Sequence, residues 1–244
     1  MPFLIAGCAI IGLIASRSIV AESNAHRRTE SDAWWSPSCE VCGRTLTVTM
    51  RRCVGDGHPQ RSMNLVVMVA TAVTFGAVAA RVPSLWVVPA YLAYSFVIVL
   101  LTITDIDTKL LPNRILLPGT VVSGSLLVVG SIASGSGWDL VRGIAAGAVY
   151  FVIMLILALV ARGALGMGDV KLAFLIGLFV GYLGWGYLVI AGLGAFILGG
   201  LVSIVLLAAR RVSRKDSIPF GPFLTSASVL AIVVGSAIIT WYTG

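Results

Sequence analysis

Two short acidic segments stand at the ends of apolar stretches in a chain that has few charges. Thr104–Asn113 contains Asp105 and Asp107, and Gly166–Lys171 contains Asp169. A carboxylate beside the hydrocarbon of a bilayer is costly, so it indicates a functional site. Two neighbouring carboxyls share one proton near neutral pH, and such a pair activates water while protonating a carbonyl oxygen. These residues therefore predict paired-carboxylate hydrolysis.

The residues around the acids fit this chemistry. Gly166 and Gly168 let the backbone turn tightly and lie close to a bound peptide, and Pro112 favours an extended Leu111. The alternative is that the acids are ordinary interfacial charges, with Asp169 complementing a helix N-terminus. The glycines, and the even number of crossings derived below, favour the catalytic pair.

Composition decides the class of protein. The chain is 58% hydrophobic and 11% charged, whereas soluble domains carry roughly 25% charged residues. Apolar stretches long enough to cross a bilayer lie at 2–20, 63–80, 84–104, 115–132, 138–160, 172–209 and 222–242. The stretch 172–209 is too long for one crossing, and Gly184-Trp185-Gly186 predicts a turn within it. We therefore expect an all-α membrane protein, a polytopic bundle of about eight transmembrane helices with one cytosolic polar loop.

The distribution of Lys and Arg predicts the orientation. If residues 21–62 are cytosolic, alternating spans leave only Arg81 and Arg142 outside among 17 basic residues, as the positive-inside rule requires. Both termini then lie outside, and two spans between Asp105 and Asp169 return both acids to the cytosolic face. The same rule explains the net charge of +7, so no nucleic-acid partner is expected. Three regions follow: a first span (1–20), a cytosolic loop (21–62) and a seven-span core (63–244).

Small residues recur four positions apart in two predicted helices, at Gly143/Gly147 and Gly177/Gly181. Such pairs let helix backbones approach closely. Packing within the bundle is the favoured interpretation, and a dimer seam is the alternative. The residues assign no oligomeric state.

Three motifs resemble those of one family, the type IV prepilin peptidases. Thr104–Asn113 is similar to its D-x-D-x-x-x-[IL]-P-[ND] signature. Gly166–Asp169 is similar to its GxGD motif, which presenilin-type intramembrane proteases share, and Ile218–Phe223 resembles its PFGPF segment. The resemblance implies a bacterial aspartic endopeptidase, multi-pass in the inner membrane, that cuts prepilins or pseudopilins after a glycine. The basic leader would be released at the cytosolic face.

The resemblance also implies residue roles. Asp105 and Asp169 correspond to the catalytic pair, and Asp107 to a supporting acid. Gly166, Gly168 and Pro112 are expected to support the site, and Lys171 to be the charge neighbour of Asp169. Proteolysis of this kind requires no cofactor.

The polar loop departs from the family pattern of two C-x-x-C pairs. Cys39 and Cys42 form one pair, but only Cys53 remains of the second, with His58 nearby. A structural zinc site with three cysteines and one histidine is compatible with this spacing, and free thiols in a reducing cytosol are the alternative. Many relatives also methylate the new N-terminus with S-adenosylmethionine, but nothing in the loop supports that activity here.

Three other functions compete with a prepilin peptidase. A protease that cuts other membrane proteins would share the GxGD motif, but it would not account for the motifs at Thr104–Asn113 and Ile218–Phe223. An ion- or proton-coupled transporter would place its carboxylates in mid-bilayer, whereas these lie at membrane edges. An inactive assembly partner would not need both acids. The expected partners are therefore the bilayer and a prepilin or pseudopilin whose identity the residues do not specify.

Overall fold

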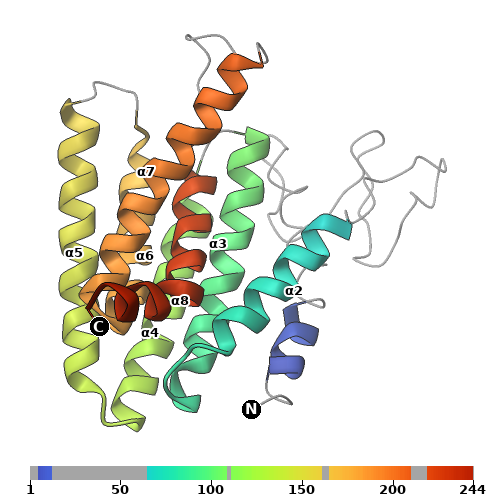
Figure 1. Cartoon of the computed structure of the whole chain (residues 1–244). Coiled ribbons are helices and arrows are strands. Elements are labelled where there is room, and N and C mark those ends of the chain that lie inside the picture. The colour runs from blue at the N-terminus through green and yellow to red at the C-terminus, as the bar shows by residue number, and fades with distance from the viewer. Residues whose placement is uncertain (1–4, 13–64, 109–110, 161–164, 210–218, 244) are drawn as a thin grey trace. The chain divides into compact units, whose positions relative to one another are not determined.

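The computed structural model describes residues 5–12, 65–108, 111–160, 165–209 and 219–243, and within these ranges the regular structure is entirely helical. A short helix covers residues 5–12. The others are α2 (Leu65–Ala79), the 3-10 helix η1 (Leu85–Val87), α3 (Val88–Thr108), α4 (Asn113–Ala133), α5 (Gly137–Val160), α6 (Met167–Leu183), α7 (Trp185–Ala208) and α8 (Gly221–Thr243) (Figure 1). The chain divides into two compact units, Met1–Ala80 and Arg81–Gly244, and the features described below lie in the second.

Five of the described helical stretches are long and apolar enough to cross a membrane: Leu85–Ile106, Asn113–Ala133, Gly137–Val160, Trp185–Ala208 and Gly221–Tyr242. A helix suits this setting because it satisfies its own backbone hydrogen bonds. The predicted polytopic all-α membrane protein is therefore confirmed. α2 and α6 are shorter, at 15 and 17 residues, and the first predicted span is described only at 5–12, so the number eight stays a prediction.

The boundary between α6 and α7 lies where the glycines predicted a turn. α6 ends at Leu183 and α7 begins at Trp185, with Gly184 between them at φ 153°. L side chains rarely adopt this φ, which is why a glycine stands there. The end of α3 differs from the prediction, because the helix continues four residues beyond Thr104. No residue that breaks a helix occurs before Pro112, so Asp105 lies inside the helix and not after it.

The two glycine pairs pack against each other between α5 and α6. A methyl group added at Gly143 would lie 2.7 Å from the carbonyl oxygen of Leu178, and one at Gly177 would lie 2.8 Å from Cα of Gly147. The backbones of the two helices therefore touch. The expected packing within the bundle is confirmed at these glycines.

α6 is enclosed by protein along most of its length. It contacts α4, α5, α7 and α8, and its residues from Leu172 to Tyr182 are buried apart from Phe174. α4, α5 and α7 instead carry long rows of exposed apolar side chains. The helix that bears Asp169 is thus an inner helix of its unit.

Hydroxyl and aromatic groups join α3 to α6 and α8. The Tyr91 hydroxyl donates to the carbonyl oxygen of Phe179 at 2.7 Å, and the Tyr94 hydroxyl donates to Oγ of Ser228 at 2.7 Å. The rings of Tyr94 and Phe179 also stack, with centroids 4.4 Å apart. These buried contacts fix the relative positions of the three helices that build the candidate site.

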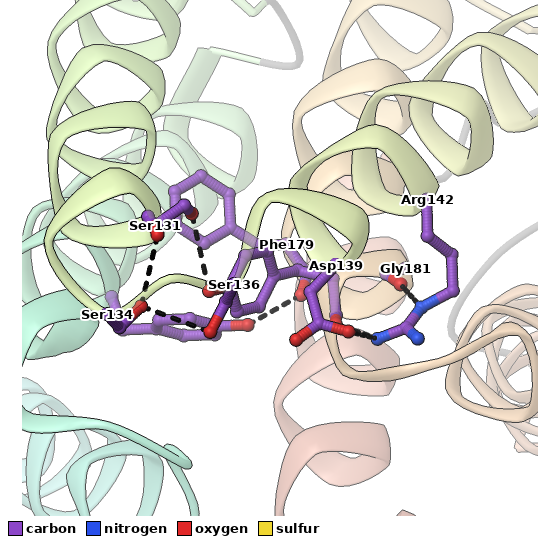
Figure 2. A network of polar contacts seen from close by, with 9 residues as sticks. Ser131, Ser134, Ser136, Asp139, Arg142, Phe179 and Gly181 are labelled. Atoms are coloured by element: carbon purple, nitrogen blue, oxygen red, sulfur yellow. Dashed lines mark hydrogen bonds and ion pairs between the residues drawn. The ribbon is translucent and has the colours of Figure 1, made fainter.

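At the opposite end of α6 from Asp169, Arg142 binds the C-terminal carbonyls (Figure 2). Its Nε donates to the carbonyl oxygen of Gly181 at 2.9 Å, its Nη2 donates to that of Tyr182, and Nη2 also pairs with Asp139 at 2.9 Å. The last carbonyls of a helix lack intrahelical donors, so a guanidinium suits this position. Asp139 compensates its charge, which explains a basic residue on the side where few were predicted.

Candidate active site

Asp105 lies near the C-terminus of α3, where its side chain turns into the protein. The residue is 4% exposed. Its Oδ2 accepts a hydrogen bond from the backbone N–H of Gly221, at the start of α8, with a distance of 3.0 Å. A carboxylate near the C-terminus of a helix interacts unfavourably with the negative end of the dipole of that helix. The N-terminus of α8 supplies the opposite partial charge and a donor.

Asp169 occupies the first turn of α6 and is 8% exposed. Its Oδ2 accepts from the backbone N–H of Gly166 at 3.3 Å, as an acid in the third helical position does when it caps a helix. Its Oδ1 is buried and accepts no hydrogen bond from the described part of the chain. One oxygen of this carboxyl is thus committed to the fold, and the other is free for chemistry.

The charge of Asp105 acts on the carboxyl of Asp169. Asp169 precedes the apolar part of α6, which begins at Leu172. The pKa of Asp169 is raised to about 6. Burial is the largest cause, the negative charge of Asp105 is the second, and the hydrogen bond from the N–H of Gly166 acts in the opposite direction. A carboxyl with this pKa is partly protonated near neutral pH, whereas an ordinary aspartic acid is not. Asp169 is thus the member of the pair that can hold a proton near neutral pH.

The two acidic motifs are joined by residues that flank Asp169 and residues that follow Asp105. A methyl group at Gly168 would lie 2.6 Å from Cβ of Leu111, so glycine is needed for this contact. One turn later, Nζ of Lys171 donates to Oδ1 of Asn113 at 2.9 Å. The carbonyl oxygen of Pro112 begins α4 by accepting from two amides of its first turn. The segment 111–113 is thus clamped to the first turn of α6.

The remaining predicted residues are placed as follows. The backbone of Asp107 lies in the last turn of α3, and its side chain lies outside the described part, so its supporting role stays a prediction. Lys171 contacts Asn113, and its charge effect on Asp169 stays a prediction as well. Packing does not require glycine at position 166, because an added methyl group would lie 3.5 Å from its nearest neighbour, Oδ2 of Asp169.

The predicted zinc ligands lie outside the described residues. These are Cys39, Cys42, Cys53 and His58. Within the ranges that the structure does describe, no three His, Cys, Asp or Glu side chains gather as a metal site would require. The cysteine described there, Cys8, is a buried free thiol in the helix over residues 5–12.

Three residues of the site were not predicted from their own chemistry. In the sequence Gly221 is only one residue of a motif, yet its amide binds Asp105. Leu111 and Asn113 are neighbours of Pro112 in the sequence, yet they contact the turn that bears Asp169. The available signal was the Gly221-Pro222 pair, which is typical of a helix start.

Comparison with known proteins shows the family of the chain. The sequence model of the type IV leader peptidase family matches residues 91–204, a range that contains both acids. The chain is 30% identical over 217 residues to a prepilin leader peptidase/N-methyltransferase of Bacillus subtilis, covering 84% of each chain. The chain belongs to the type IV leader peptidase family. It is therefore a peptidase and a multi-pass membrane protein.

Other members of the family are longer. The chain is 33% identical to a protein of the same name from Aeromonas hydrophila and spans 65% of its length. A relative from Legionella pneumophila is 32% identical, and the chain spans 51% of it. No solved structure matches the chain. The relatives give the transporter alternative no support.

Proposed function

We propose that this peptidase removes the basic leader of prepilins or pseudopilins at the cytosolic membrane face, with Asp105 and Asp169 as its catalytic pair. The observation that carries the proposal is that two buried carboxyls, on α3 and α6, interact electrostatically, with the pKa of Asp169 raised to about 6 by burial and by the charge of Asp105. This arrangement needs neither a metal nor a covalent intermediate. The names of the relatives supply the substrate class.

The two acids take different roles in the proposed mechanism. Asp105 is the ionised partner, because its Oδ2 accepts the amide of Gly221 at the positive end of α8. It accepts a proton from water as the oxygen of that water attacks the scissile carbonyl carbon. Asp169 donates its proton to the carbonyl oxygen from its free Oδ1. As the tetrahedral intermediate collapses, Asp169 takes a proton back from one of its hydroxyl groups, the C–N bond breaks, and the proton on Asp105 passes to the leaving amine nitrogen.

The proposed orientation places this end of the unit in the cytosol and both chain termini outside. Lys109, Arg114, Arg162 and Lys171 lie within or beside the two acidic motifs in the sequence, whereas Arg142, at the other end of α6, is paired with Asp139. Positive charge thus accumulates on the side of the acids, as cytosolic loops require. Labelling of single introduced cysteines with a membrane-impermeant reagent tests this orientation.

The polar loop is proposed to act separately from proteolysis. The relatives' names include N-methyltransferase, an activity that would use S-adenosylmethionine on the newly formed N-terminus. Zinc held by the four predicted ligands would be structural. Both proposals are tested without reference to cleavage, by measuring zinc in the purified protein and the mass of the mature N-terminal peptide.

The catalytic proposal is tested by cleavage of a co-expressed prepilin. Asp105→Asn and Asp169→Asn preserve shape but remove one titrating group each, and each should abolish processing. Asp139→Asn is the matched control, since it removes a carboxylate at the other end of the unit. Processing that survives either of the first two substitutions would rule out the proposed pair. Wild-type protein that moves ions but leaves the prepilin intact would favour a transporter.

A further inference from the structure

The structure assigns to Gly221 the positioning of Asp105, an inference that rests on the proposed function of the acidic pair. Its backbone N–H holds the carboxylate, and its missing side chain leaves the space that the carboxylate fills. Gly221 is thus a positioning residue, because it acts on the substrate only through Asp105. Three observations support this assignment.

The first observation concerns the amides at the start of α8. The first turn of a helix exposes N–H groups without intrahelical acceptors. Pro222 has no N–H, and those of Phe223 and Leu224 both donate to the carbonyl oxygen of Phe220, at 3.0 and 3.2 Å. Among the first four residues of α8, the amide left to bind a carboxylate is therefore that of Gly221. The sequence directs one donor at Asp105.

The second observation is steric. A methyl group at Gly221 would lie 2.5 Å from Oδ2 of Asp105 and 3.2 Å from its Cγ. Carbon and oxygen atoms do not approach this closely without a bond, so any side chain here displaces the carboxylate. Glycine at this position therefore leaves the space that the carboxylate of Asp105 occupies.

The third observation is that aromatic rings anchor the start of α8. The ring of Phe220 lies against that of Phe196 on α7, with centroids 5.3 Å apart. A methyl group added at Gly199 would lie 3.2 Å from the ring of Phe220 and 3.3 Å from that of Phe223. The rings thus pack closely on the backbone of α7. They hold the segment that carries Gly221 independently of its bond to Asp105.

One experiment tests the geometry without relying on activity. The Cβ positions of residues 105 and 221 are 3.6 Å apart, within the range that a disulfide needs. The four native cysteines are first replaced, Cys8 by Ala and Cys39, Cys42 and Cys53 by Ser. Asp105→Cys with Gly221→Cys should then form a disulfide under mild oxidation, whereas Asp105→Cys with Gly200→Cys should not, because nothing lies within 4 Å of a Cβ at Gly200. Absence of the first cross-link in folded protein would overturn the inference.

A second experiment tests the positioning role in the intact enzyme. Gly221→Ala should lower kcat for prepilin cleavage on the order of 10²-fold, because Asp105 is displaced by about 1 Å. The protein should remain folded and KM should stay at its wild-type value, which a merely structural role would not predict. Gly200→Ala is the matched control and should keep full activity. A wild-type kcat in Gly221→Ala would refute the positioning role. A wild-type enzyme that leaves the prepilin uncut would instead refute the proposed function, and the disulfide experiment would still test the contact between Gly221 and Asp105.

Discussion

Substitution of Gly168 by alanine tests whether the contact between the two acidic motifs sets the geometry of the catalytic pair. The added Cβ would lie 2.6 Å from Cβ and 3.2 Å from Cδ1 of Leu111. Carbon atoms in contact prefer about 3.5–4.0 Å. The segment after Asp105 must therefore move by about 1 Å relative to the turn that carries Asp169.

The expected loss of activity is much larger than the expected loss of stability. Overpacking of this kind costs about 1–3 kcal/mol, and alanine in a helix returns up to about 1 kcal/mol relative to glycine. A displacement of about 1 Å in a catalytic group, by contrast, lowers the rate on the order of 10²-fold. Prepilin cleavage and melting temperature, both measured in the same detergent, separate the two effects.

Two further variants make this prediction specific. Gly124→Ala in α4 is the control, because its added methyl group would meet its nearest neighbour at an ordinary 3.7 Å. Leu111→Gly removes the atoms that Gly168→Ala would strike, so the double variant should be more active than Gly168→Ala alone. Full activity in Gly168→Ala, or a double variant no better than the single one, would refute the steric reasoning.

Three more predictions concern the charge and packing around α6. Because the pKa of Asp169 is about 6 in the fold, its ionisation opposes folding above that pH by roughly 3 kcal/mol. Asp169→Asn should therefore raise the melting temperature at about pH 7.5 and change it little at about pH 3, where the carboxyl is mostly protonated in both the folded and the unfolded state. The buried Tyr150 hydroxyl has no partner in the described part of the chain, so Tyr150→Phe should not lower the melting temperature, whereas Tyr91→Phe loses its bond to Phe179 and should cost about 1 kcal/mol. Arg142→Lys keeps the charge but not the fork of donors, so melting curves should show lower stability while prepilin cleavage, at the other end of α6, keeps its kcat.

The sequence was informative wherever a local property decides the structure. Charge-free stretches predicted the helices, and Gly184 predicted the break between α6 and α7 because few other residues adopt its φ. The position at which α3 ends was harder to predict, because no residue between Asp105 and Leu111 has a helix propensity low enough to stop the helix. Local patterns thus gave the elements, with errors of a few residues at their ends.

Contacts between distant segments could not be predicted in the same way. The bond between Gly221 and Asp105 joins residues 116 positions apart, and it depends on the packing of α7 and α8. The glycine pairs of α5 and α6 permitted two interpretations, because close backbone approach looks the same within a chain and between chains. The hydrogen bond that Nζ of Lys171 donates to Oδ1 of Asn113 was likewise not predicted, whereas its role as a charge neighbour of Asp169 stays a prediction.

The enclosure of α6 by other helices bears on how the enzyme tolerates different membranes. At 1.5 Å per residue its 17 residues span roughly 25 Å, less than the hydrocarbon thickness of about 30 Å. A lipid-facing helix of that length would thin the bilayer or shift in depth. Because α6 is surrounded by α4, α5, α7 and α8, lipid contacts the outer helices, and a change in bilayer thickness acts on them first. Asp169 then keeps its depth when lipid chain length changes, and the enzyme should work equally well in thin and thick bilayers.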